Sequence, residues 1–219
     1  MPRRSYKDRL VEAAYESRSV IIDPGHPHQW TSGFWMPVYT DHDRLLLSYE
    51  HRLLVNRGLR DLITHNGLKY DIIAGLKTAP QSFGTTLANS LKADFIYVDP
   101  KTGEIGCIPK DQRLDGKEIL PVEDAVSTAG SLATAVRALR NAGGSVNNCV
   151  AITTYEFPEA EKLLDSLSCR LFTLLTFHDL LGGAKGFGVS DEYIRETEAW
   201  HSDKFNWGER HGYPRSDRK

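Results

Sequence analysis

The chain has 219 residues, of which 40% are hydrophobic and 26% are charged. That is enough for one well-buried domain and too few for two large ones. Its 27 Lys and Arg residues against 29 Asp and Glu residues give a formal net charge of -2, so the chain lacks the basic field that holds DNA or RNA by counterion release. No apolar run approaches the roughly 18 residues that span a bilayer, and the charged N-terminus shows no signal peptide. We therefore expect no nucleic acid partner and no membrane partner.

The three cysteines, Cys107, Cys149 and Cys169, are far apart in the sequence and lack C-x-x-C spacing. This pattern argues against a disulfide framework and against a zinc site. A reducing compartment fits it, and we expect a cytoplasmic protein. Cys107, in a polar segment, is the cysteine for which reactivity is expected, and the other two are interpreted as inert small residues.

The N-terminal part of the chain predicts a helix followed by a small cap subdomain. Apolar residues at helical spacing occur over residues 5–17, and residues 20–22 are typical of a short strand. Residues 23–43 are rich in Pro, Gly, His and aromatic residues, and their prolines exclude a long helix, so we expect strands and loops there. Helical periodicity returns over residues 50–65, and Gly67 stands where a helix C-cap is expected.

The middle of the chain predicts strands and helices in regular alternation. Strands are expected at 70–74, 94–98, 118–122, 146–153 and 170–175, and helices at 81–91, 132–141 and 159–167. The polar segment 101–115 predicts a hairpin or mobile loop, and its length suggests a function. The alternation indicates a parallel sheet with helices on both faces. The strand ends that carry loops should then share one edge, where ligand is expected.

The last 37 residues, 183–219, are polar and aromatic and show weak periodicity. A peripheral helix near 191–201 is expected, and the remainder predicts no element. Four aromatic residues of this segment leave two interpretations open: Trp200, His201, Trp207 and His211. They form either a platform for a nucleobase or a tail that packs on its own domain or on a dimer partner.

One motif, residues 119–131, carries most of the chemical information. It is an apolar strand that ends in Glu123 and Asp124, followed by a turn of small residues that opens a helix. Backbone N–H groups and hydroxyls at a helix N-terminus form a site for a phosphate dianion. The two acids, as hydrogen-bond acceptors, suit the 2′ and 3′ hydroxyls of a ribose that carries this phosphate. A sugar phosphate is implied, and the alternative is an ordinary acidic strand end followed by a capped helix.

The motif resembles the loop that binds phosphoribosyl pyrophosphate (PRPP) in type I phosphoribosyltransferases, where a strand, two acids and a Thr- and Gly-rich turn bind the ribose 5-phosphate. The phosphate-binding residues that this resemblance implies are Ser127, Thr128, Ala129, Gly130 and Ser131. Ala129 stands where many members have Gly. Because a backbone amide remains, we expect the change to be tolerated unless the position needs a positive φ.

The resemblance covers most of residues 20–181 and is closest to the orotate phosphoribosyltransferase family. Residues 31–41 resemble the family's cap motif, 71–79 its strand and pyrophosphate loop, and 171–181 its closing strand and short helix. The implied fold is a type I phosphoribosyltransferase-like parallel sheet flanked by helices, with a small cap (hood) subdomain. We expect a single domain over 1–182, with the cap mostly in 1–45 and the core in 46–182, and a C-terminal extension over 183–219.

The resemblance also implies residues on the pyrophosphate and base sides of the site. Backbone amides from Gly75 to Thr78 would meet the diphosphate, and Lys77 would either add a charge there or be a solvated lysine. Arg44 would contact phosphate or form a surface ion pair with a nearby Asp. Tyr39 would shape the base pocket or be a half-buried cap aromatic. The remaining base-side positions that the resemblance implies are Thr31, Ser32 and Tyr155.

The chain departs from the family at three places. Thr31 stands where the cap motif begins with Lys, and Tyr155 stands where an Arg meets orotate. The mobile loop has no His and two lysines, Lys101 and Lys110, with Arg113 just beyond. Orotate is an anion, and a carboxylate is usually recognised by Arg or Lys. Either the base differs, or other side chains such as His26, His28, Lys77 and Arg44 replace the cations, or the protein binds PRPP without efficient turnover.

The resemblance leads to two functional hypotheses. The first is an enzyme that transfers ribose 5-phosphate from PRPP to a nitrogenous base with release of pyrophosphate, as in pyrimidine nucleotide biosynthesis, and its catalytic residues would be Glu123, Asp124, Lys101 and Lys110. The second is a non-catalytic regulatory module that binds PRPP. In either case Mg²⁺ would be carried mainly by PRPP, with no protein metal ligand expected. A homodimer is expected because the family's loop completes the neighbouring subunit's site.

Overall fold

The structure is a computed structural model that describes residues 4–30, 33–109 and 111–215. The chain divides into two compact units. The larger unit comprises residues 46–177, and the smaller unit comprises residues 1–45 together with residues 178–219. The C-terminal segment therefore belongs to the same compact unit as the cap residues, while the expected division into a domain over 1–182 and an extension stays a prediction.

The larger unit is built on a sheet with the strand order β10-β9-β8-β5-β6-β7 among the described residues. In chain order the strands are β5 (Ile72–Leu76), β6 (Asp94–Val98), β7 (Ile105–Gly106), β8 (Ile119–Val126), β9 (Asn148–Thr154) and β10 (Arg170–Thr176). All neighbouring strands are parallel except β7, which runs antiparallel to β6 at the edge. The parallel sheet predicted from the sequence is confirmed, and the polar segment after β6 forms a hairpin, one of the two expected alternatives.

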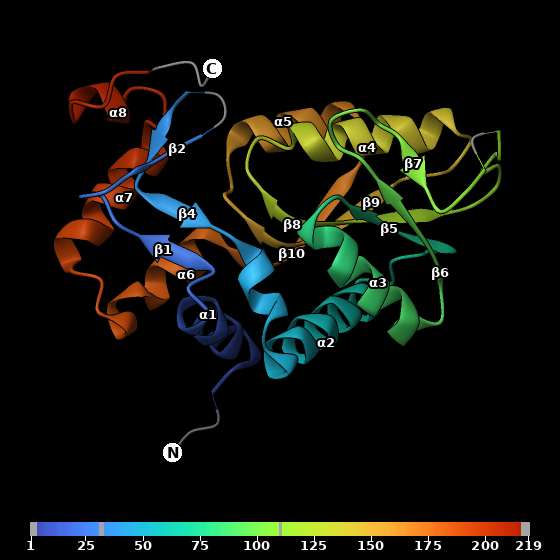
Figure 1. Ribbon diagram of the computed structural model, residues 1–219, viewed down its shortest axis with the longest axis horizontal. Coiled ribbons are helices and arrows are strands. Elements are labelled where there is room, and N and C mark those ends of the chain that lie inside the picture. The colour runs from blue at the N-terminus through green and yellow to red at the C-terminus, as the bar shows by residue number, and fades with distance from the viewer. Residues whose placement is uncertain (1–3, 31–32, 110, 216–219) are drawn as a thin grey trace. The chain divides into compact units, whose positions relative to one another are not determined.

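Helices cover both faces of this sheet (Figure 1). They are α2 (Tyr49–His65), α3 (Ala79–Leu91), α4 (Gly130–Asn141) and α5 (Pro158–Ser166). α2 and α3 lie on one face, and α4 and α5 lie on the other. The fold is thus the mixed α/β arrangement with a mostly parallel sheet that the sequence predicts.

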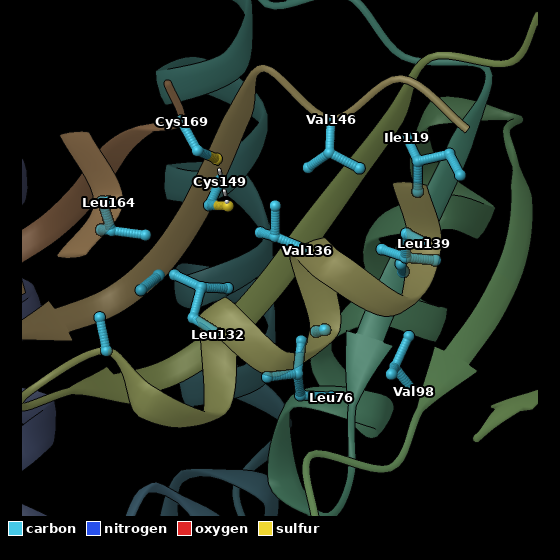
Figure 2. Packing of buried hydrophobic residues seen from close by; sticks show 14 of the residues in the cluster. Leu76, Val98, Ile119, Leu132, Val136, Leu139, Val146, Cys149, Leu164 and Cys169 are labelled. Carbon is cyan, nitrogen blue, oxygen red and sulfur yellow. Dashed lines mark hydrogen bonds between the residues drawn. The ribbon is translucent and has the colours of Figure 1, made fainter. Parts of the chain in front are cut away.

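The core of the larger unit lies where α4 meets the sheet (Figure 2). Leu132, Val136 and Leu139 recur at the spacing of one helix face and are each no more than 1% exposed. They belong to one cluster with strand residues that include Leu76 and Ile119. Burying each such side chain fully stabilises the fold by about 1.5–3 kcal/mol. This packing fixes the first turn of α4 against the end of β8.

Gly75 lies inside β5. The sequence predicts a strand over 70–74 that ends before this glycine, and that strand end is wrong. All five residues of β5 are buried, and the strand continues to Leu76. A Cβ atom built on Gly75 would lie 2.7 Å from the Cα of Gln81 and 2.8 Å from the carbonyl oxygen of Pro80. The glycine therefore lets the first turn of α3 approach the strand directly, and it is needed for this close approach rather than for a turn.

The smaller unit contains short strands and several helices. They are α1 (Tyr6–Glu16), β1 (Val20–Ile22), β2 (His28–Gln29), β3 (Trp35–Met36), β4 (Val38–Thr40), the 3₁₀ helix η1 (His42–Leu46), α6 (Phe177–Gly183), the 3₁₀ helix η2 (Ala184–Phe187), α7 (Asp191–Ser202) and α8 (Trp207–Arg210), with η1 and α6 each crossing a unit boundary. β1 pairs with β4, and β2 pairs with β3. The expected helix near 191–201 is confirmed as α7, and α8 was not predicted.

The aromatic residues of the C-terminal segment pack inside the smaller unit. Trp200 and Trp207 are fully buried. The Trp200 indole Nε1 donates to the carbonyl oxygen of Trp35 at 3.2 Å, and the Trp35 Nε1 donates to the carbonyl oxygen of Pro214 at 3.0 Å. The interpretation of these two tryptophans as a nucleobase platform is therefore wrong, because their ring faces are not accessible. No helix in the described ranges is both long enough and apolar enough to cross a membrane.

Candidate active site

The two predicted phosphate-binding segments meet at one edge of the large sheet. β5 lies between β6 and β8, so the chain leaves β5 toward one side and later returns to pair on its other side. Such a reversal of strand order is where parallel α/β sheets bind ligands, in the crevice beyond the carboxyl ends of the strands. The loop after β5 carries Lys77 and Thr78, and the turn after β8 carries Ser127 and Thr128. The structure brings these segments together as the sequence predicts.

The acid pair lies within β8, which ends four residues later than the expected strand over 118–122. Glu123 is buried, with 7% of its surface exposed, and Asp124 is half-buried. The backbone N–H of Asp124 donates to Glu123 Oε1 at 3.0 Å, and the N–H of Ala125 donates to Asp124 Oδ1 at 2.8 Å. Burial, and then the neighbouring Asp124 carboxylate, raise the pKa of Glu123 well above its usual range. Asp124 is therefore the more accessible acceptor of the two.

The turn after β8 leaves the N-terminus of α4 without a side-chain cap. Ala129 is the N-cap residue and has no hydroxyl to accept from the first turn. The first N–H groups of a helix have no partner within the helix and are usually capped by a Ser, Thr or Asp side chain. Here these N–H groups, from Gly130 onward, are placed to donate to an anion, and the positive end of the helix dipole favours one.

Ala129 adopts the left-handed conformation, with φ +62° and ψ +15°. From the sequence, Ala at this position is expected to be tolerated unless the backbone there needs a positive φ. Since the position does need one, the Cβ of Ala129 carries a steric cost of about 1–2 kcal/mol that Gly would avoid. The turn is nevertheless formed, with Ala129 buried against the core of α4.

Lys77 is held in place by Tyr97 of β6 and by Asp99, directly after that strand. Its ammonium lies 3.3 Å from Asp99 Oδ2 and 4.9 Å from the centre of the Tyr97 ring. The side chain is 34% exposed, so Lys77 is partly solvated while its ammonium has an ion-pair partner. Thr78, whose peptide bond to Lys77 is cis, begins α3 without a side-chain cap. The uncapped start of α3 thus lies beside a fixed cation.

Asp99 is a structural residue of this edge that the sequence analysis missed. Besides Lys77, it accepts the backbone N–H of Lys101 on Oδ1 at 2.9 Å. That backbone bond first, and Lys77 as well, lower the pKa of the Asp99 carboxyl. An acid directly after a parallel strand, on the edge where ligand is expected, is the signal that would have identified it. Asp99 fixes both Lys77 and the start of the hairpin that carries the exposed Lys101.

The other predicted residues of the mobile segment are placed differently. Arg113 forms an ion pair with Asp115 at 3.1 Å and donates from Nη1 to the carbonyl oxygen of Asn141 at 2.9 Å, at the C-terminal end of α4. These contacts tie Arg113 to the fold rather than to the hairpin. Lys110 lies outside the described residues. No group of three or more metal-ligating side chains occurs within the described part of the chain.

The base-side residues are tied into packing and ion pairs. Tyr155 is buried, and its ring stacks with Phe157 at 5.5 Å between centroids. In the smaller unit, Tyr39 is half-buried and stacks on His28 at 4.7 Å. Arg44 donates from Nε to Asp41 at 2.9 Å and from Nη1 to the carbonyl oxygen of Arg18 at 3.0 Å, which matches the ion-pair interpretation. Thr31 and Ser32 lie outside the described residues.

Comparison with known proteins decides the family. No family model matches the chain. An orotate phosphoribosyltransferase from Streptococcus sanguinis is 32% identical over 194 residues, which covers 87% of this chain and 92% of that protein. The chain belongs to the orotate phosphoribosyltransferase family. Membership confirms the resemblance inferred from the sequence motifs and the assignment of the chain as a phosphoribosyltransferase.

Solved structures support the fold of an orotate phosphoribosyltransferase. A UMP synthase from Leishmania donovani matches with a TM-score of 0.78 at 24% identity, over 90% of this chain and 42% of that chain. This protein therefore spans less than half the length of that relative. An orotate phosphoribosyltransferase from Mycobacterium tuberculosis, solved in complex with PRPP, matches with a TM-score of 0.62 at 22% identity, over 80% of this chain and 99% of that chain. At these identities the likeness is one of fold.

Proposed function

We propose that the protein transfers the 5-phosphoribosyl group of PRPP to orotate and releases pyrophosphate, a step of pyrimidine nucleotide biosynthesis. The observation that carries the proposal is the uncapped N-terminus of α4, which follows the acid pair of β8 at the point where the strand order reverses. Family membership supplies the base, because the relatives that match over most of the chain are orotate phosphoribosyltransferases.

The proposed mechanism assigns each group of this edge to one part of PRPP. The N–H groups at the start of α4 and the Ser127 and Thr128 hydroxyls bind the 5-phosphate. Glu123 and Asp124 accept from the ribose hydroxyls and orient the ring for attack by the base. Lys77 and the backbone amides before α3 bind the diphosphate and stabilise the charge that develops as it leaves. Positioning and charge stabilisation then lower the barrier to an oxocarbenium-like transition state.

Mg²⁺ belongs to the proposal as an ion that PRPP brings with it. The Asp124 carboxylate is an oxygen donor of the kind that Mg²⁺ prefers, directly or through its waters, whereas Glu123 is buried and its pKa is raised. Bound there, the ion would neutralise negative charge on the diphosphate. The accessible Asp124 is the residue best suited to hold one of those waters.

The proposal also includes a homodimer in the cytoplasm. Leu47 and Tyr49 are 92% and 64% exposed at the start of α2, and apolar side chains this exposed favour an interface. Lys101 is exposed on its hairpin, where it could reach the diphosphate of a neighbouring subunit. Light scattering at micromolar concentration should give twice the chain mass of 24.6 kDa. A particle of the single chain mass would contradict the dimer without affecting the assignment of the reaction.

A panel of bases tests the reaction. The full chain is incubated with PRPP, Mg²⁺ and one base at a time, and pyrophosphate release is followed. Orotate should give pyrophosphate release, but more slowly than the common enzyme range of about 1–1000 per second, because the cations that the family has at positions 31 and 155 are missing. The buried Tyr155, standing where the family has an Arg, favours the alternative of a PRPP-binding module. Tight PRPP binding by calorimetry without pyrophosphate release from any base would establish that module instead.

A further inference from the structure

Two buried cysteines lie in contact in the larger unit. The Sγ atoms of Cys149 and Cys169 are 3.2 Å apart, and both residues are at most 3% exposed (Figure 2). Cys149 lies on β9, and Cys169 lies in the turn just before β10, which pairs with β9. A disulfide needs the sulfurs at about 2.05 Å, so the thiols need to approach by only about 1.2 Å. This contact contradicts the expectation that both cysteines are inert.

The backbone around Cys169 allows that approach better than the backbone around Cys149. Cys149 lies inside the ladder, where β10 pairs with it through Leu171. Cys169 precedes the first paired residue of β10 and follows Ser168, which has φ +47°. A small shift of this turn would bring its sulfur nearer without breaking the pairing of the two strands.

The surroundings of the two thiols shift their pKa values in opposite directions. The Arg140 guanidinium donates to the carbonyl oxygen of Leu167 at 2.7 Å and to that of Val146, which fixes it beside the turn. The hydrogen bond with Cys149, and then Arg140, lower the pKa of Cys169. Burial raises the pKa of Cys149 well above its usual range. Cys169 lines a cavity that Cys149 does not reach, so Cys169 is the thiol placed to act as the nucleophile.

Cys169 also has a route to solvent. It lines a cavity of about 350 Å³ between α5 and the strands β9 and β10. The charged side chains that line this cavity are Glu156, Glu161, Asp165 and Arg170. Three carboxylates against one guanidinium disfavour an anionic oxidant such as glutathione disulfide. A small neutral oxidant can enter without this penalty.

We infer that Cys149 and Cys169 form a reversible oxidative modification site, in which hydrogen peroxide converts the pair of thiols to a disulfide. The Cys169 thiolate attacks one peroxide oxygen, the O–O bond breaks, and the leaving hydroxide takes up a proton to become water. Cys169 is then a sulfenic acid. The Cys149 sulfur attacks the Cys169 sulfur, the S–O bond breaks, and the departing hydroxide leaves as water with the Cys149 proton. Two thiols and one peroxide give one disulfide and two waters, and two electrons pass from sulfur to peroxide.

The site is independent of phosphoribosyl transfer, so its test does not depend on the substrate. The native full-length protein is treated with hydrogen peroxide, denatured, alkylated, reduced and labelled with a second reagent before peptide mass spectrometry. Cys149 and Cys169 should both carry the second reagent, a parallel sample left unreduced should contain them as one linked peptide pair, and dithiothreitol given before the first alkylation should restore first-reagent labelling of both. The same result is expected in Cys107→Ser, which lacks the exposed thiol. If Cys149 and Cys169 stay reduced while Cys107 is oxidised, the inference is wrong.

Two further measurements separate the roles of the two sulfurs and the class of oxidant. In Cys149→Ala, Cys169 should gain oxygen atoms instead of forming a disulfide, since no thiol resolves the sulfenic acid. An unmodified Cys169 in this folded variant would overturn the assignment of Cys169 as the attacking residue. Should the variant fail to fold, the wild-type measurement alone still decides the site. Glutathione disulfide should oxidise the pair at least tenfold more slowly than peroxide, and equal rates would overturn the charge argument.

Discussion

The phosphate-binding edge and the base side of the site are built from different kinds of group. At the edge, the proposed phosphate donors are the backbone N–H groups at the uncapped starts of α3 and α4, and these depend on packing more than on side-chain identity. On the base side, recognition of a carboxylate depends on individual cations. The edge keeps the family's pattern with one change, Ala129, whereas the base side lacks the family's cations at Thr31 and Tyr155. A change of side chain such as Ala129 leaves the backbone N–H groups of the edge in place, whereas the changes to Thr31 and Tyr155 remove the cations themselves.

The largest expected effect comes from restoring the family's Arg on the base side. Tyr155→Arg should destabilise the fold by about 3–5 kcal/mol, because it places a charge without a partner among Phe157 and Phe177. Denaturant unfolding measures the loss, with Tyr155→Phe as the matched control that keeps the ring. A Tyr155→Arg protein of normal stability with faster orotate turnover would show that the pocket still accepts the family's cation, and would weaken the contrast between the two sides.

The next effect is on PRPP binding at the edge. Asp124→Asn combined with Ser127→Ala should weaken PRPP binding at least tenfold, about 1.4 kcal/mol, since each change removes a charge-assisted or direct hydrogen bond. Calorimetry with Mg²⁺ present measures the affinity. The control is Asp165→Asn with Ser166→Ala, a neighbouring Asp and Ser pair that is exposed near the end of α5. Unchanged PRPP affinity in the folded Asp124 and Ser127 double variant would show that the acid pair and the turn do not bind PRPP.

Sequence reasoning found the edge because its signals are local. An apolar strand, two acids, small residues and a helical pattern follow one another in the chain, and each has a direct backbone consequence. Side-chain partners depend instead on segments far apart in the sequence. The pairing of Lys77 with Asp99, 22 residues later, needs the register between β5 and β6. The burial of Tyr155 needs the position of Phe177, and the close approach at Gly75 needs the start of α3.

A pH effect on stability should distinguish the two acids of the edge. The folded-state pKa of Glu123 is raised above that of the unfolded chain, so the folded state holds the proton more tightly. The stability that this proton contributes is full below the unfolded pKa of about 4.3 and is lost as the pH rises through the folded pKa. Glu123→Gln keeps the acceptor for the Asp124 N–H and cannot ionise. It should gain stability over the parent as pH rises, on the order of 1 kcal/mol at neutral pH.

Unfolding curves between pH 4 and pH 8 measure this difference. Glu161→Gln, on the exposed side of α5, is the matched control and should show no comparable dependence on pH. A flat difference between Glu123→Gln and the parent would mean that Glu123 is charged in both states. In that case the edge would present two carboxylates to the ribose rather than one accessible carboxylate and one buried acid.

The smallest expected effect concerns the one change within the phosphate turn. Ala129→Gly should stabilise the fold by about 0.5 kcal/mol, because relief of the left-handed strain at φ +62° exceeds the entropy that Gly adds to the unfolded chain. Ala138→Gly, in the interior of the same helix, should instead cost about 1 kcal/mol. PRPP affinity should remain within twofold in Ala129→Gly, because the backbone N–H groups that bind the phosphate stay in place. If Ala129→Gly destabilises as much as Ala138→Gly, burial of the Ala129 methyl group stabilises the fold by more than the left-handed strain destabilises it. This part of the edge would then depend on side-chain identity.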